Sequence, residues 1–156
     1  MSLEKQLQIG AVFTPLSWAI FAIRQTKIYE KWLGGSTVFD PTMGEGNLLE
    51  ALIEIGLDEG KTIDELPTEL LFGNEMNAIF YTNAIQKFKK KYGIVHTKNF
   101  SNEDIFDLKQ QPYDILLGNP PWQNFSDISI HYKEKINSLP WRGESKYIVD
   151  KIVERH

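Results

Sequence analysis

Apolar residues near the N-terminus recur at helical spacing. They fall at Leu16, Ile20, Ile23, Ile28 and Trp32. This period predicts an amphipathic helical segment over residues 14–32. Thr14 suits its N-cap and Pro15 its first helical position, because a hydroxyl can accept from a free amide and proline has no amide to lose. The pair Gly34-Gly35 then ends the pattern.

Shorter apolar runs predict four strands further along the chain. These strands lie at 37–40, at 70–75, within 94–100 and at 113–118. The last run is nearly all apolar, which predicts a strand buried on both faces. Helical spacing predicts helices over 47–55 and 77–92, and an irregular acidic insertion occupies 56–68. Beyond the fourth strand we expect a loop to about residue 143 and a helix over 144–155.

Strands that alternate with helices predict an α/β fold with a doubly wound, mostly parallel sheet. Ligands of such sheets bind beyond the carboxyl ends of the strands. A polar residue stands at each of these ends: Asp40, Glu75, Asp104 and Asn119. We therefore expect one ligand crevice lined by these side chains. The whole chain is expected to form a single domain, with a helical segment (1–35), a core (36–122) and a closing loop and helix (123–156).

Composition narrows the function classes. The net charge of −4 argues against a self-sufficient DNA-binding module, because phosphate contacts need clustered Lys and Arg. Lys87 and the run Lys89-Lys90-Lys91 are predicted to be solvated at a helix end, with a nucleic-acid-facing patch as the alternative. The absence of cysteine excludes disulfides and thiolate metal sites and fits a cytoplasmic location. The three histidines are too scattered to predict a metal site, and no apolar run is long enough for a membrane span.

Residues 40–46 read Asp-Pro-Thr-Met-Gly-Glu-Gly, a glycine-bearing turn between a predicted strand and a predicted helix. Gly44 and Gly46 allow close approach of the backbone to a ligand, and the next helix presents free amides. The dinucleotide fingerprint Gly-x-Gly-x-x-Gly is absent. Asp40 would repel phosphate but suits a cationic ligand that carries an amino acid group. The alternative is a turn that binds nothing.

Two further acids fit a nucleoside ligand. Glu75 ends the second strand, where a carboxylate can accept both hydroxyls of a ribose. Asp104 could accept the amine of an adenine ring, with Ile105 and Phe106 as apolar cover. The alternatives are a structural acid at Glu75 and a helix or turn cap at Asp104.

The run Asn119-Pro120-Pro121-Trp122 offers the groups needed to bind a planar amine. Proline has no amide donor, so the carbonyls here only accept, and Asn119 adds a side-chain acceptor. Asn119 and the Pro120 carbonyl could take the two amine hydrogens while Trp122 stacks on the ring, which holds a nucleophilic nitrogen in place. A base in a duplex would first have to flip out. The alternative is a rigid turn after a buried strand.

These motifs resemble those of the class I S-adenosylmethionine-dependent methyltransferases that act on adenine in DNA, of the restriction-modification type. Residues 38–49 resemble the first cofactor motif of the family. Residues 10–15 resemble a preceding motif, whose Thr-Pro pair contacts the methionine end of the cofactor. Residues 119–122 match the catalytic motif, with Trp122 where Tyr or Phe is more usual.

The resemblance implies S-adenosyl-L-methionine as cofactor and a flipped adenine in DNA as substrate. Its implied catalytic residues are Asn119, Pro120 and Trp122. Its implied cofactor-binding residues are Thr14, Pro15, Asp40, Pro41, Gly44, Gly46, Glu75, Asp104, Ile105 and Asn119. A protein glutamine or an RNA base is the alternative substrate, and a non-catalytic interaction subunit is the alternative to an enzyme.

The family has a seven-stranded sheet, whereas about four strands are predicted here. We therefore expect the methyltransferase fold to be incomplete and the target-recognition domain to be absent from this chain. A partner subunit or a C-terminal remainder is expected to cover the open sheet edge. This chain alone is expected to bind the cofactor weakly and to methylate nothing.

Overall fold

The computed structural model describes residues 13–94, 96–109, 111–119, 130 and 133–134. The predictions for Pro120, Trp122 and a helix over 144–155 lie outside these residues.

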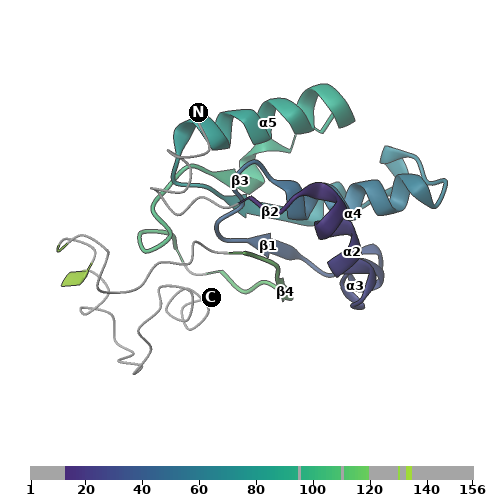
Figure 1. Ribbon diagram of the computed structural model, residues 1–156, viewed down its shortest axis with the longest axis horizontal. Coiled ribbons are helices and arrows are strands. Elements are labelled where there is room, and N and C mark those ends of the chain that lie inside the picture. The colour runs from purple at the N-terminus through teal and green to yellow at the C-terminus, as the bar shows by residue number, and fades with distance from the viewer. Residues whose placement is uncertain (1–12, 95, 110, 120–129, 131–132, 135–156) are drawn as a thin grey trace.

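Among the described residues, four parallel strands form the sheet, in the order β3-β2-β1-β4 (Figure 1). Their bounds are β1 Val38–Asp40, β2 Leu71–Asn74, β3 Phe100–Ser101 and β4 Ile115–Leu116. In register, Phe39 pairs with Phe72 on one side and with Leu116 on the other. The predicted α/β fold with a parallel sheet is confirmed.

The N-terminal helical pattern is divided between two helices, α2 (Leu16–Arg24) and α3 (Ile28–Leu33). The Thr26 hydroxyl separates them, because it donates to the Ile23 carbonyl and accepts from the Ile28 amide. The predicted start was one residue too early. Pro15 is the N-cap, and its carbonyl accepts from the amides of residues 18 and 19 at 3.0 Å.

The two predicted central helices are present as α4 (Asn47–Asp58) and α5 (Ala78–Tyr92). The Asn77 side chain caps α5 by accepting from the amides of residues 79 and 80, and Gly93 ends it in the left-handed region. The predicted insertion over 56–68 begins later than expected, since α4 runs to Asp58. Two 3-10 turns follow, η1 (Ile63–Glu65) and η2 (Thr68–Leu70).

Side chains alternate between the two faces of the sheet. Val38, Leu71 and Ile115 pack in the main core with residues of α2, α4 and α5, such as Ile23, Leu52 and Phe88. Phe39, Phe72 and Leu116 point to the other face, where they meet Ile105, Phe106 and Tyr113. The Tyr113 ring stacks on Phe39 with centroids 4.4 Å apart.

Three local predictions were wrong. β4 is shorter than residues 113–118 and only partly buried, because in the described sheet it is an edge strand. β3 reaches only the last residue of the predicted range, because the 3-10 turn η3 (Thr97–Asn99) precedes it. Ile130, Lys133 and Glu134 are helical although a loop was expected there. Lys and Glu are good helix formers, which favours the helical conformation at residues 133 and 134.

Candidate functional site

Asp40 lies at the carboxyl end of β1 and is 1% exposed. Its Oδ1 accepts from the Thr42 amide at 3.1 Å. Burial raises the pKa of Asp40 to about 8, and the Glu75 carboxylate adds to the rise although the Thr42 amide opposes it. A buried acid of this kind favours a cation beside it, because a cation would stabilise the ionised carboxylate.

Glu75 follows β2 and holds the glycine-bearing loop 41–46 in place. One carboxylate oxygen accepts from the Gly44 amide at 2.9 Å and the other from the Asn77 amide at 2.7 Å. Burial raises the pKa of Glu75, and the two amides oppose that rise. Glu75 therefore has a structural role in this loop, as the sequence alternative allowed. Its predicted ribose contact stays a prediction.

Asn74 is a site residue that the sequence reasoning missed. This side chain is 1% exposed and donates to the carbonyls of Pro41 and Glu103. Its oxygen accepts from the Ser101 hydroxyl and the Glu103 amide. The Asn74 amide thus connects the loop after β1 to the loop after β3. The signal was its place at a strand end, directly before Glu75.

Aromatic rings pack where side chains at Gly44 and Gly46 would lie. A Cβ on Gly44 would come within 2.6 Å of the Phe13 ring, and one on Gly46 within 2.8 Å of the Phe88 ring. Both glycines have positive φ, at 56° and 79°. The loop therefore needs glycine for its own packing as well as for any approach of a ligand. Phe13 also packs edge-on against Phe80 with centroids 4.7 Å apart.

Substitution of Gly46 by alanine is expected to destabilise the fold. Backbone strain costs about 1–2 kcal/mol, and the clash with Phe88 adds about 1–3 kcal/mol. Gly60→Ala is a matched control, because Gly60 has a similar φ of 83° but open space around its Cβ position. Chemical denaturation of both variants separates the two costs. Equal losses of stability would contradict the packing role of Phe88.

Asn119 follows β4 and is tied to the segment before α2. Its Nδ2 donates to the Thr14 hydroxyl at 3.1 Å. A Cβ on Gly118 would lie 3.3 Å from Asp40 Oδ1. The structure thus brings Thr14 and Asn119 beside the carboxyl end of β1, although these two residues are 105 positions apart.

Asp104 caps a turn, since its Oδ1 accepts from the Phe106 amide at 3.0 Å. The neighbouring Glu103 is held by Asn74, so Asp104 lies near the same edge of the sheet. Ile105 is 8% exposed and packs in the cluster with Phe39 on the second face. The cap reading is thus confirmed for Asp104, and its predicted adenine contact stays a prediction.

No protein-family model matches the chain, and neither does any curated protein. Solved structures do match it. A Listeria monocytogenes protein assigned to the class I S-adenosylmethionine-dependent methyltransferases has a TM-score of 0.62 at 15% identity, with 94% of this chain and 42% of that one covered. The chain has a methyltransferase-like α/β fold.

Two further matches carry the same fold. One is assigned as the modification subunit of a type I restriction enzyme from Vibrio vulnificus YJ016, with a TM-score of 0.63, 17% identity and coverage of 91% and 29%. The other is the type I restriction-modification system methyltransferase subunit from Streptococcus thermophilus, with a TM-score of 0.59, 22% identity and coverage of 92% and 31%. The chain therefore spans less than half the length of these methyltransferase-fold proteins.

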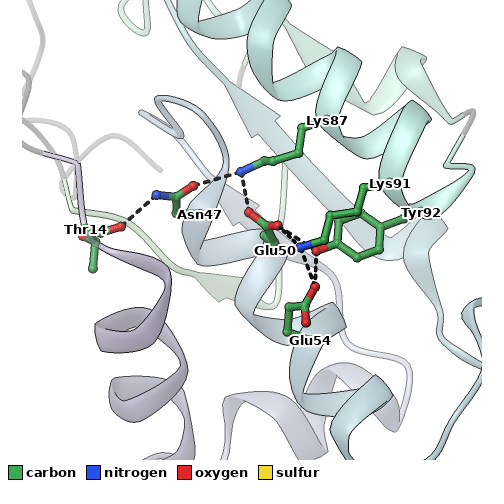
Figure 2. A network of polar contacts seen from close by, with 7 residues as sticks. All are labelled: Thr14, Asn47, Glu50, Glu54, Lys87, Lys91 and Tyr92. Atoms are coloured by element: carbon green, nitrogen blue, oxygen red, sulfur yellow. Dashed lines mark hydrogen bonds and ion pairs between the residues drawn. The ribbon is translucent and has the colours of Figure 1, made fainter.

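Behind the glycine loop, this methyltransferase fold contains a buried carboxylate, Glu50 of α4, which is 4% exposed. Lys87, Lys91 and Tyr92 of α5 all donate to it, as Figure 2 shows. Lys91 and Tyr92 also bond to Glu54. The prediction that the lysines are solvated at a helix end is confirmed for Lys89, Lys90 and Lys91, which are exposed in the last turn of α5. It was wrong for Lys87, which lies before that turn and is partly buried. The side chains of Lys87 and Lys91 reach the acids of α4, whose spacing from α5 the sequence did not show.

In the described ranges, no group of three or more His, Asp or Glu side chains is placed to hold a metal ion. No helix among the described residues has the length and apolar character that a membrane crossing requires.

Proposed function

We propose that this chain supplies the cofactor- and amine-binding part of an S-adenosylmethionine-dependent methyltransferase that modifies the exocyclic amine of adenine in DNA. The hydrogen bond between Thr14 and Asn119 supports this proposal most directly. It joins the predicted catalytic motif to the predicted cofactor motif, beside the acid of β1. A rigid turn without function would not require that juxtaposition.

The residues present fit the cofactor. S-adenosylmethionine supplies a methyl group on a positively charged sulfur and carries an α-amino group. The desolvated Asp40 carboxylate suits such cationic groups. Thr14, Pro15, Pro41, Gly44 and Gly46 are assigned to the same cofactor site as Asp40. Glu75 is assigned to the ribose, and Asp104 with Ile105 to the adenine ring.

In the proposed site, Asn119 and the Pro120 carbonyl accept the hydrogens of the target amine, and Trp122 stacks on the base. S-adenosylmethionine, when bound, would supply an electrophilic methyl group on a positively charged sulfur. Asn119 and the Pro120 carbonyl would hold the target nitrogen so that it could take this methyl group and give up a proton to solvent. Positioning and fixed dipoles provide the rate enhancement.

The two type I neighbours are consistent with a place in a restriction-modification system. In that setting, the reader of the DNA sequence would lie outside this chain, in agreement with its net charge of −4. We propose that further strands, from a partner subunit or from additional chain, continue the sheet beyond β4. The protein would act in the cytoplasm as a single methyltransferase domain.

The test measures transfer of labelled methyl groups by the full-length protein to DNA, RNA and protein. We expect incorporation into DNA at adenine. Incorporation into RNA or into protein glutamine instead would show that DNA is not the substrate. Calorimetry with S-adenosylmethionine decides the cofactor separately, and an absence of binding would favour a non-catalytic subunit.

Cofactor binding is expected to depend on pH through Asp40. With a pKa of about 8, this carboxyl is largely protonated at pH 6, and a bound cation would lower the pKa again. Binding should therefore release a proton below pH 8, and affinity should rise with pH up to about 8 and then level off. Calorimetry in buffers of different ionisation enthalpy measures the released proton.

Asp40→Asn is the matched variant, because its amide oxygen can still accept from Thr42 while the charge is lost. It should bind the cofactor more weakly and without the pH dependence. In the free wild-type protein, the contribution of Asp40 to stability should be complete below pH 3.8 and should be lost as the pH rises to about 8, because the unfolded chain releases the proton first. Asp40→Asn should lack this loss; an unchanged pH profile would contradict the role of Asp40.

A further inference from the structure

A chain of hydrogen bonds leads from the interface of α4 and α5 to Asn119. Lys87 Nζ donates to Glu50 and also, at 2.9 Å, to Asn47 Oδ1. Asn47 Nδ2 donates to the Thr14 carbonyl at 2.9 Å, and the Thr14 hydroxyl accepts from Asn119. Figure 2 shows the links from Lys87 through Asn47 to Thr14. Asn47 thus links the interface of α4 and α5 to the segments that contain Thr14 and Asn119.

The orientation of the Asn47 amide is fixed from both ends. A lysine ammonium only donates, so the oxygen of Asn47 must face Lys87. A backbone carbonyl only accepts, so the nitrogen of Asn47 must face Thr14. A half-turn of the amide would place donor against donor at one end and acceptor against acceptor at the other. Asn47 therefore holds the Thr14 backbone at the start of α4.

Thr14 and Asn119 both lie just outside regular elements. Thr14 precedes α2, and its carbonyl bonds to the Asn47 side chain rather than to a helical amide. Asn119 lies three residues beyond the end of β4 and is exposed. Side-chain contacts therefore set the geometry between these two segments, and Asn47 provides one that is anchored in the core through Lys87 and Glu50.

We propose that Asn47 is a positioning residue for Asn119. It holds Thr14 so that the Thr14 hydroxyl binds the nitrogen end of the Asn119 amide. The oxygen and nitrogen of a planar amide lie on opposite sides, so this contact directs the oxygen of Asn119 to the target amine. The inference rests on the proposed function, in which that oxygen accepts a hydrogen of the amine.

Asn47→Asp separates positioning from folding. A carboxylate at this position still pairs with Lys87 and suits the first turn of a helix, so stability should be kept. The carboxylate cannot donate to the Thr14 carbonyl, and its oxygens repel the carbonyl oxygen. We expect an unchanged or higher melting temperature and shifted resonances for the Asn119 side-chain amide in a ¹H–¹⁵N spectrum of this chain. In the full-length protein, kcat should fall about tenfold with KM for DNA unchanged.

Asn83→Asp is the matched control. Asn83 of α5 donates to Glu45 at 2.9 Å, so the same substitution breaks a similar contact outside the chain of bonds to Asn119. It should leave the Asn119 resonances and kcat unchanged. Unshifted Asn119 resonances in Asn47→Asp, or equal shifts in both variants, would overturn the proposal.

If Asn47→Asp lowers the melting temperature, two Thr14 variants test the contact between Thr14 and Asn119 instead. Thr14→Val removes the hydroxyl and must shift the Asn119 resonances, whereas Thr14→Ser keeps the hydroxyl and must not. The opposite result overturns the proposal. A wild-type protein that transfers no methyl group would instead reject the proposed function, while the spectra would still show whether Asn47 orients Asn119.

Discussion

Replacement of Asn119 by alanine should abolish most methyl transfer and leave cofactor affinity nearly unchanged. In the proposed mechanism Asn119 accepts a hydrogen of the target amine, and this contact matters most as the nitrogen attacks. Loss of one such preorganised polar group costs about 10²–10³-fold in rate. The measurement pairs single-turnover methyl transfer by the full-length protein with calorimetry of cofactor binding.

The control for this prediction is Asn83→Ala, which removes the same side chain from an exposed position on α5. It should retain wild-type rate and affinity. Parallel loss of rate and cofactor affinity in Asn119→Ala would count against the assigned role. That result would indicate that Asn119 supports the cofactor site, to which it is linked through Thr14.

Replacement of Glu50 by glutamine should cause a substantial loss of stability. The charge of Glu50 is shared by Lys87 and Lys91, and Tyr92 donates to the same carboxylate. Removing one member of a buried ion pair costs about 3–5 kcal/mol. The lysine side chains are 25% and 49% exposed and can regain water. We therefore expect a loss of about 2–3 kcal/mol, slightly below that range.

This contribution should disappear in acid. Burial alone would raise the pKa of Glu50, but the bonds from Lys87, Tyr92 and Lys91 outweigh it and hold the pKa below its usual value of 4.5. The stabilisation is thus complete above pH 4.5 and is lost as the pH falls through the lowered pKa. Denaturation curves of wild type and Glu50→Gln should converge at low pH.

Asp58→Asn provides the matched control on the same helix. The ion pair of Asp58 with Arg24 is exposed on both sides, and such pairs contribute at most about 1 kcal/mol. If Glu50→Gln costs no more than Asp58→Asn, the α4–α5 network does not stabilise the fold as described.

Local sequence signals were sufficient for the elements whose causes are local. Asn77 and Gly93 bracket α5 because a capping side chain and a left-handed glycine act within one turn of the helix. Glycine at 44 and 46 likewise follows from the positive φ of the loop. By contrast, the break near Thr26 was missed, because apolar spacing continues through it and the hydroxyl that ends α2 leaves no trace in periodicity.

The sequence by itself determined the order of helices and strands in a parallel α/β fold and the polar residues at the strand ends. Helical spacing, short apolar runs and the polar residue after each run are all properties of neighbouring positions. Tertiary structure alone decided which distant groups meet. It placed Lys87 and Lys91 on Glu50 and Asn119 on Thr14. It also packed the rings of Phe13 and Phe88 into the space beside Gly44 and Gly46. Such contacts depend on how whole helices pack on the sheet. That packing is determined by many residues together, so no single motif predicts it.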